Sequence, residues 1–260
     1  MIPGTKDDLG PWLGERLGEF STGIHFLTRL PLPRHAPLGG HAVGQSVWAF
    51  PLAGVVVGLI GALVYALAHR LGLPSWPAAA LAVAATLGVT GCLHDDGLAD
   101  TADGFGGGDT TERKLDIMRD SRIGTYGVCA LILALLLRVS ALASIAATVP
   151  VGLALLAAHG AGRASLPFVM WLLPPARSSG LSSSAGRPPG DRVAAAAVLG
   201  TLILAICLHP GRGVVALGLV AIVVAVMAWL SNKQIDGQTG DVLGAVEQIS
   251  EIAILLVAAG

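Results

Sequence analysis

Residues 44–69 read GQSVWAFPLAGVVVGLIGALVYALAH and carry no Asp, Glu, Lys or Arg. Because about 20 mainly apolar residues suffice for a helix to cross a bilayer, this stretch predicts a membrane span. Six further runs of this kind follow, at 76–93, 125–147, 151–173, 193–208, 214–230 and 243–259. The sequence therefore predicts an all-α fold, a polytopic transmembrane helical bundle of about seven spans.

The composition agrees with a membrane protein. Hydrophobic residues make up 53% of the chain and charged residues 13%, whereas roughly 25% of a soluble domain is charged. Gly54, Gly58 and Gly61 share one face of the first span, and small residues let helix backbones approach closely. We favour packing within the bundle over a dimer interface for this face, and a homo-oligomer is left open. The sequence shows no pattern typical of nucleic-acid binding.

The beginning of the chain is more polar than the rest. We expect a cytoplasmic or interfacial segment at 1–43 and a single transmembrane catalytic domain at 44–260. Residues 9–29 are amphipathic, which predicts a helix lying on the membrane surface. The chain does not begin with the apolar core of a signal peptide, so the first span is expected to remain in the mature protein.

The basic residues predict the orientation in the membrane. Twelve lysines and arginines fall in segments 1–43, 94–124, 174–192 and 231–242, against Arg70 and Arg212 in the intervening loops. Short loops rich in Lys and Arg remain on the cytoplasmic side. We therefore expect a multi-pass protein of the cell (inner) membrane, with its N-terminus and loop 94–124 facing the cytoplasm.

The most polar loop begins HDDGLADTADG at residues 94–104. On a helix continuing from the preceding span, Asp96, Asp100 and Asp103 are spaced i, i+4 and i+7 and share one face, while Asp95 and His94 point elsewhere. Like charges at this spacing repel each other, and a divalent cation relieves the conflict. A solvated acidic face is the alternative, but such a face usually mixes in Lys and Glu. The stripe therefore predicts a site for Mg²⁺, which prefers carboxylate oxygens, water and phosphate.

The next stretch, FGGGDTTERKLDIMRDSRIGTYG at 105–127, has features of phosphate binding. Arginine side chains match phosphate oxygens, and glycines let backbone N–H groups approach a phosphate at the start of a helix. Asp120 is a fourth candidate metal ligand. The candidate substrate-binding residues here are Arg119, Ser121, Arg122 and Gly124. Anchoring at the cytoplasmic membrane surface is the alternative role of the two arginines.

Polar residues inside the spans are costly and usually functional. Arg163 lies in the middle of the fourth predicted span, and Glu247 and Glu251 lie in the last one, after Thr239 and Asp241. One interpretation is an Arg163–Glu251 ion pair that only holds the bundle together. The other is a polar cavity on the cytoplasmic side, with Arg163, Thr239, Asp241 and Glu251 as substrate-binding residues.

Together these features favour phosphoryl transfer, in which metal ions and arginines neutralise a diphosphate while an acceptor hydroxyl attacks. We find no P-loop and no arrangement of a nucleophilic serine or cysteine. The spacing does not identify the general base, for which an aspartate of the cluster, such as Asp96, and His94 are the candidates.

These motifs resemble the signature of the cobalamin synthase family, the adenosylcobinamide-GDP ribazoletransferases. The similar stretches are HDDGLADTADG at 94–104, RDSRIGTYGV at 119–128, FLTRLPLP at 26–33, FPLAGVVVGLIGAL at 50–63 and GQTGDVLGA at 237–245. The resemblance implies that the hydroxyl of α-ribazole, or of its 5′-phosphate, attacks adenosylcobinamide-GDP with release of GMP and a requirement for Mg²⁺. It also implies that Asp96, Asp100, Asp103 and Asp120 hold metal or phosphate, and that Arg122 and Asp241 lie near the substrates.

Three alternatives remain open. A CDP-alcohol phosphotransferase also uses a helix with an aspartate stripe, but its D-G-x-x-A-R core is missing at residues 96–101. A membrane prenyltransferase usually needs two DDxxD motifs, and we find one such cluster. An ion-coupled transporter would use Arg163 and Glu251, although the repeated halves typical of transporters are not visible.

Overall fold

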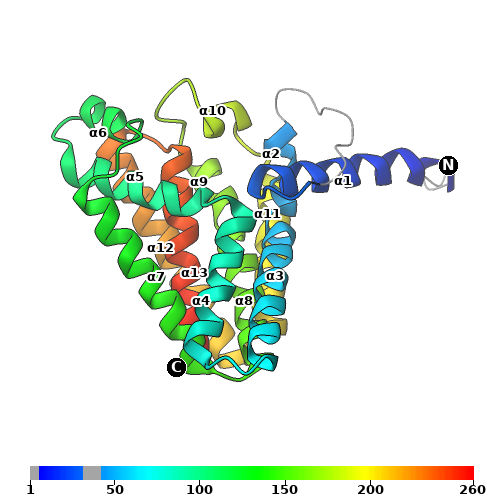
Figure 1. The fold of residues 1–260 in the computed structure, drawn as a ribbon. Coiled ribbons are helices and arrows are strands. Elements are labelled where there is room, and N and C mark those ends of the chain that lie inside the picture. Colours follow the sequence, from blue (N-terminus) through cyan, green and yellow to red (C-terminus); the bar gives the residue numbers. More distant parts are fainter. Residues whose placement is uncertain (1–5, 32–41) are drawn as a thin grey trace.

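The computed structural model describes residues 6–31 and 42–260, which form helices and one isolated bridge between Pro175 and Gln238. The long helices run side by side, and short ones gather at one end of the bundle (Figure 1). The helices are α1 (Lys6–Leu27), α2 (Ala42–Ser46), η1 (Val47–Ala49), α3 (Phe50–Arg70), α4 (Ser75–Thr90), α5 (Leu93–Gly107), α6 (Thr111–Ile117), α7 (Thr125–Ile145), α8 (Thr148–Ala164), α9 (Leu166–Leu172), α10 (Leu181–Ala185), α11 (Gly190–Cys207), α12 (Pro210–Ile235) and α13 (Gly240–Ala259).

The helices confirm the predicted polytopic bundle. In the described part of the chain, 6 helical segments are long and apolar enough to cross a membrane, or up to 7 if the bent pair α4 and α5 counts as one span. These segments are Ala42–Arg70, Thr125–Ile145, Thr148–Leu172, Gly190–Cys207, Pro210–Ile235 and Gly240–Ala259. The domain boundary expected at 43/44 falls within α2, which leads through η1 into α3.

The aspartate-rich stretch forms a helix of its own. The expectation that the preceding span continues into it is wrong, because α4 and α5 meet at an angle of 89°. Gly91 and Cys92 make this break with left-handed φ values of 64° and 59°. The apolar α4 therefore ends before the polar stretch, and α5 turns away across one end of the bundle (Figure 1).

The same end of the bundle collects the segments that the basic residues mark as cytoplasmic. Helices α5 and α6, the region of α10 and the α12–α13 connection lie there, whereas the C-terminus lies at the opposite end (Figure 1). This arrangement agrees with the prediction that these loops lie on the same side of the membrane. Which end faces the cytoplasm stays a prediction.

The amphipathic N-terminal helix is confirmed as α1, which extends sideways from that end of the bundle (Figure 1). Glu19, which is buried, anchors it to the bundle by accepting from Trp48 Nε1 at 2.6 Å and by pairing with Arg192 Nη2 at 3.4 Å. Trp12 and Leu13 are about half exposed on the part that extends beyond the bundle. Contact of α1 with a membrane surface stays a prediction. Arg34 and the end of the 26–33 match lie outside the described residues.

The glycine face of the first span packs inside the bundle, as favoured from the sequence. A Cβ atom built on Gly54 would lie 2.0 Å from the His159 carbonyl oxygen, and one on Gly58 would lie 2.6 Å from the Leu155 carbonyl oxygen. Helices α3 and α8 therefore touch backbone to backbone, a contact that only glycine permits. This contact brings His159 and its neighbours on α8 to the centre of the molecule.

We predict opposite effects of two glycine-to-alanine changes. Gly54→Ala should lower the stability by roughly 1–3 kcal/mol, because the methyl group meets the backbone of α8. Gly218→Ala on α12, where nothing lies within 4 Å of the added atom, should keep or slightly raise the stability. Thermal unfolding in detergent measures both. A Gly54→Ala protein as stable as the wild type would contradict the close packing.

Candidate active site

A cavity of about 260 Å³ opens at the end of the bundle crossed by α5. Its walls come from α5, from the loop that follows α9, and from the start of α13. The polar residues that line it are His94, Asp96, Arg177, Ser179, Ser182, Ser183, Gln238, Thr239 and Asp241. Four of the residues predicted from the sequence, His94, Asp96, Thr239 and Asp241, therefore meet in one place.

A close crossing of α5 and α13 brings these residues together. A Cβ atom on Gly97 would lie 2.7 Å from the Asp241 carbonyl oxygen and 3.1 Å from the Gly244 Cα atom. Both helices need glycine here, because a side chain on either would push the backbones apart. The crossing places Asp96 of α5 and Asp241 of α13 on the same cavity, although 145 positions separate them in the sequence.

Asp241 is held by two neighbours. Its Oδ2 atom accepts from Arg177 Nη2 at 2.6 Å and from the Thr239 hydroxyl at 3.1 Å. The Thr239 oxygen also accepts from the backbone N–H of Val242 at 3.3 Å, which caps the start of α13. Thr239 thus orients a carboxylate of the cavity and begins the helix that carries it.

Asp100 lies within the electrostatic reach of the other acidic groups. Burial, followed by the charges of Asp96, Asp241 and Asp103, raises the pKa of Asp100 to about 7. The negative potential of these carboxylates is therefore not balanced by the arginine nearby. An all-oxygen set of this kind fits Mg²⁺, which usually keeps several waters and is bound through one or two carboxylates and substrate phosphates. Asp96 and Asp241 line the cavity and are the candidate ligands of such an ion, with Asp100 as a neighbouring carboxylate.

The other end of the predicted stripe has different contacts. Asp103 is buried and accepts from the backbone N–H groups of Gly124 at 2.7 Å and Gly127 at 2.9 Å. It therefore caps the start of α7, as carboxylates commonly do at helix N-termini. The three aspartates do share one helical face, but this capping role leaves Asp103 less available as a metal ligand than the sequence suggests.

The Arg-Asp-Ser-Arg stretch lies apart from the cavity. Asp120 binds Arg122 through several hydrogen bonds, including Nη2–Oδ2 at 2.5 Å, and this contact lowers the pKa of Asp120 to about 2. Asp120, Arg122 and Gly124 line a second depression together with Asp103. Arg119 and Ser121 are exposed and line neither of these two depressions. The structure therefore does not bring Asp120 to Asp96, and metal binding by Asp120 stays a prediction without geometric support.

Beneath the cavity, a buried ion network joins four helices. Asp95 of α5 accepts from Arg138 of α7 at 2.5 Å, and Arg138 also lies 3.6 Å from Glu251 of α13. Arg163 of α8 pairs with Glu247 of α13 at 2.6 Å. All of these side chains are at most 9% exposed. Buried charges of this kind must be paired, because removing a charge from water costs several kcal/mol.

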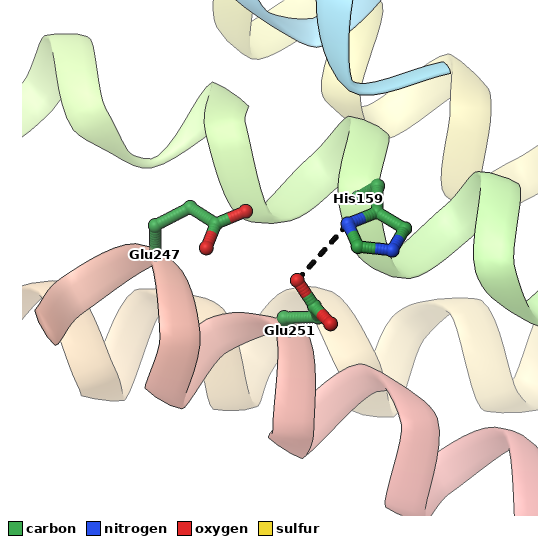
Figure 2. Close-up of side chains that lie close together, drawn as sticks. All are labelled: His159, Glu247 and Glu251. Carbon is green, nitrogen blue, oxygen red and sulfur yellow. Dashed lines mark ion pairs between the residues drawn. The ribbon is translucent and has the colours of Figure 1, made fainter. Parts of the chain in front are cut away.

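Figure 2 shows the part of this network formed by His159, Glu247 and Glu251. His159 Nδ1 lies 3.0 Å from Glu251 Oε2. The proposed Arg163–Glu251 ion pair is thus replaced by two others, Arg163 with Glu247 and His159 with Glu251. The two glutamates lie one turn apart on the same face of α13, so the position of α8 along α13 decides which of them faces the arginine.

His94 connects the network to the cavity. Its Nδ1 atom lies 3.6 Å from Glu247 Oε2 and 3.4 Å from Arg163 Nη2, and the residue also lines the cavity. Arg163 and Glu251 are 1% and 2% exposed and do not line it. The structure therefore does not place Arg163 and Glu251 where they could contact a substrate in the cavity.

The network also contains a group with the composition of a metal site. Among the described residues, His159, Glu247 and Glu251 are the one set of three whose ligand atoms lie within 4.8 Å of one another. However, the Arg163 guanidinium is 2.6 Å from Glu247 and 3.2 Å from His159. Because a guanidinium already balances these charges, the arrangement disfavours a second cation here.

Several residues of the site escaped the sequence analysis. Arg177 and the serines after it were read only as part of a basic loop, and the stretch RSSGLSSS at 177–184 was the available signal. Arg138 lies within a predicted span, where a charge is by itself a sign of function or burial in the bundle. Asp95 points away from the aspartate stripe, as expected, but its partner on α7 cannot be read from local sequence.

The helical bundle and the acidic cavity at its end identify a polytopic membrane protein with a polar site at one end of its spans. A family model described as cobalamin-5-phosphate synthase matches residues 19–259. The chain therefore belongs to the cobalamin-5-phosphate synthase family, which confirms the resemblance seen in its motifs.

Curated relatives agree with this membership. The chain is 54% identical, over 100% of its length and 98% of the relative, to an adenosylcobinamide-GDP ribazoletransferase of Bradyrhizobium diazoefficiens. It is 52% identical to the one of Mesorhizobium japonicum, over 93% of each chain. It is 45% identical to the one of Azorhizobium caulinodans, over 92% of this chain and 94% of the relative. No solved structure matches the chain.

The ion network predicts a marked loss of stability on removal of its central arginine. Arg138→Met should destabilise the protein by roughly 3–5 kcal/mol, because Asp95 then remains buried without its counter-charge and Glu251 keeps only His159. The double variant Arg138→Met with Asp95→Asn should recover part of the loss. Thermal unfolding in detergent tests both, with Arg212→Met at the opposite end of the bundle as control. Equal losses in the single and double variants would contradict the pairing.

The acidic neighbours of Asp100 predict that removal of its carboxylate stabilises the protein in a pH-dependent way. The pKa of Asp100 is raised from 3.8 to about 7 in the folded chain. Between pH 3.8 and about pH 7, Asp100 is protonated in the folded chain but ionised in the unfolded chain. The free energy of unfolding therefore falls as the pH rises through this range, and the loss is complete above about pH 7. Asp100→Asn should therefore raise the melting temperature of metal-free protein clearly at pH 8 and less at pH 5. An equal rise in melting temperature at both pH values would show that the ionised Asp100 is not destabilised by its neighbours.

Proposed function

We propose that this protein is an Mg²⁺-dependent adenosylcobinamide-GDP ribazoletransferase of the cell inner membrane. It joins adenosylcobinamide-GDP to α-ribazole or its 5′-phosphate, the last assembly step of the cobalamin nucleotide loop. The cavity lined by Asp96 and Asp241 at one end of the spans, with the charge of Asp100 close by, carries this proposal. The relatives that match almost the whole chain bear the name adenosylcobinamide-GDP ribazoletransferase, which supports it.

The reaction is a substitution at phosphorus. The hydroxyl oxygen of the ribazole forms a new bond to the phosphorus next to cobinamide, and the bond from that phosphorus to the bridging oxygen breaks. GMP leaves with the bridging oxygen, and the hydroxyl proton passes to a base. Such reactions depend mainly on positioning and on neutralising the negative charge of the phosphates.

The residues of the cavity suit these tasks. Asp96 and Asp241 of the cavity, with the nearby Asp100, would hold the metal ion, which would neutralise the diphosphate and the leaving phosphate. Thr239 fixes the orientation of Asp241. The cavity holds two kinds of proton acceptor, His94 and the aspartates, and both remain candidates for the base.

The membrane setting follows from the same geometry. Large apolar side chains are exposed along the long helices, among them Leu63, Leu133, Ile206, Val214 and Ile222, and these suit contact with lipid. The basic loops at the cavity end favour a cytoplasmic position for this end, where a nucleotide-bearing substrate is available. The apolar face of α1 suits the surface of the same leaflet.

A transport function has less support. The buried cluster that fills the opposite end of the bundle is mainly apolar and includes Val151, Leu155, Ile254 and Leu255. In the described part of the chain, the ion network therefore does not continue as a polar path to that end. The CDP-alcohol and prenyltransferase alternatives lack the matching motifs.

The proposed reaction predicts a direct assay. Purified protein with Mg²⁺, adenosylcobinamide-GDP and α-ribazole should release GMP, measured by chromatography. Asp96→Asn should reduce the rate at least about 100-fold, because a carboxylate proposed to hold the metal ion is lost. Asp109→Asn, which changes an exposed aspartate at the end of the same segment, should retain the wild-type rate.

Two results would contradict these assignments. No GMP release by the folded wild type would reject the function. Full activity of Asp96→Asn would reject the metal site while leaving the function intact.

A further inference from the structure

The loop that carries Arg177 is fastened to the start of α13. Ala176 donates its backbone N–H to the Gln238 carbonyl oxygen at 2.8 Å, and Gln238 donates to the Pro174 carbonyl oxygen at 2.9 Å. These two bonds make the isolated bridge between residues 175 and 238. The backbone next to Arg177 is thereby held beside Thr239 and Asp241.

The loop is fastened a second time after five more residues. The Ser182 hydroxyl donates to Gln238 Oε1 at 2.5 Å, and both residues are buried. Ser231 in turn donates to the Gly237 carbonyl oxygen at 2.5 Å, which steadies the connection before α13. One glutamine thus secures both ends of the loop, and the residues between them form a wall of the cavity.

Arg177 lies on this wall with most of its hydrogen-bonding capacity unused. Its side chain is 15% exposed and lines the cavity together with Asp96 and Asp241. Among the described residues, its hydrogen-bond partner is Asp241 alone, at 2.6 Å. A guanidinium has five N–H donors arranged in a fork that matches phosphate oxygens.

This ion pair engages a carboxylate that the proposed function gives to the metal ion. A divalent cation beside Asp241 repels the guanidinium, whereas a diphosphate in the cavity attracts it. The loop keeps the arginine within the cavity in either case, because the loop is secured by its backbone and by Gln238 rather than by the ion pair.

We propose that Arg177 is a substrate-binding residue that changes partners, from Asp241 in the empty cavity to the diphosphate of the GDP-bearing substrate once a metal ion occupies Asp241. This inference rests on the proposed function. It gives the Arg177 side chain opposite effects on the binding of the metal ion and of the substrate. Without substrate, Arg177 weakens metal binding, and with substrate it strengthens the binding of the diphosphate.

The test measures both effects in the same variants. Mn²⁺ binding to metal-free protein without substrate is followed by electron paramagnetic resonance, and KM and kcat for adenosylcobinamide-GDP are followed by GMP release. Arg177→Gln should bind Mn²⁺ about threefold to tenfold more tightly, because a neighbouring positive charge is gone. Its KM for adenosylcobinamide-GDP should rise about tenfold to 100-fold, because a charge-assisted fork to the diphosphate is lost.

Two further variants serve as controls. Arg177→Lys keeps the charge without the fork, so its Mn²⁺ affinity should equal that of the wild type while its KM rises by an intermediate amount. Arg187→Gln changes another arginine near the same loop, which donates to the Trp171 carbonyl oxygen at 2.9 Å and does not line the cavity. It should leave both quantities unchanged.

The outcomes separate this inference from the proposed function. Weaker Mn²⁺ binding together with a lower melting temperature in Arg177→Gln would show a structural role and overturn the proposal. An unchanged KM in an otherwise active Arg177→Gln enzyme would also overturn it. Failure of the wild type to release GMP would reject the function instead, and the Mn²⁺ measurements would still decide whether Arg177 competes with a cation for Asp241.

Discussion

The ion pair between Asp95 and Arg138 is the contact on which the rest of the site depends. It lies inside an apolar bundle, where an unpaired charge costs several kcal/mol, so each partner fixes the other. Through Glu251 the same arginine also reaches α13. The start of the aspartate-rich helix is therefore bound to two spans, and its rotation about its own axis is restricted.

That restriction gives α5 two different faces. One face carries His94 and Asp95 into the buried network, and another presents Asp96 to the cavity. The helix crosses α13 at Gly97 and Gly244, which brings Asp241 to the same cavity. The Asp95–Arg138 pair and the close packing of Gly97 against Gly244 together decide which carboxylates meet. The opposite wall is provided by the loop of Arg177, so the cavity has an acidic side and a basic side.

Much of this could be predicted from local sequence. The apolar runs gave the spans to within a few residues, since a membrane helix has a required length and hydrophobicity. The i, i+4 and i+7 spacing correctly placed Asp96, Asp100 and Asp103 on one helical face. The motifs at both ends of the chain indicated the family, which the comparisons confirm. The break between α4 and α5 was missed, because a left-handed residue such as Cys92 leaves no clear signal in a run of apolar residues.

By itself, then, the sequence determined the class of fold, the polar segments and the family, because hydrophobicity and helical period are properties of neighbouring residues. Only the tertiary structure decided which charges pair and which carboxylates share a cavity. Arg163 faces Glu247 and not Glu251, Asp103 caps α7, and Asp120 lies in another depression. These outcomes depend on the rotation and depth of helices packed against each other. A shift of one helical turn exchanges the partners, and no local pattern in the sequence records such a shift.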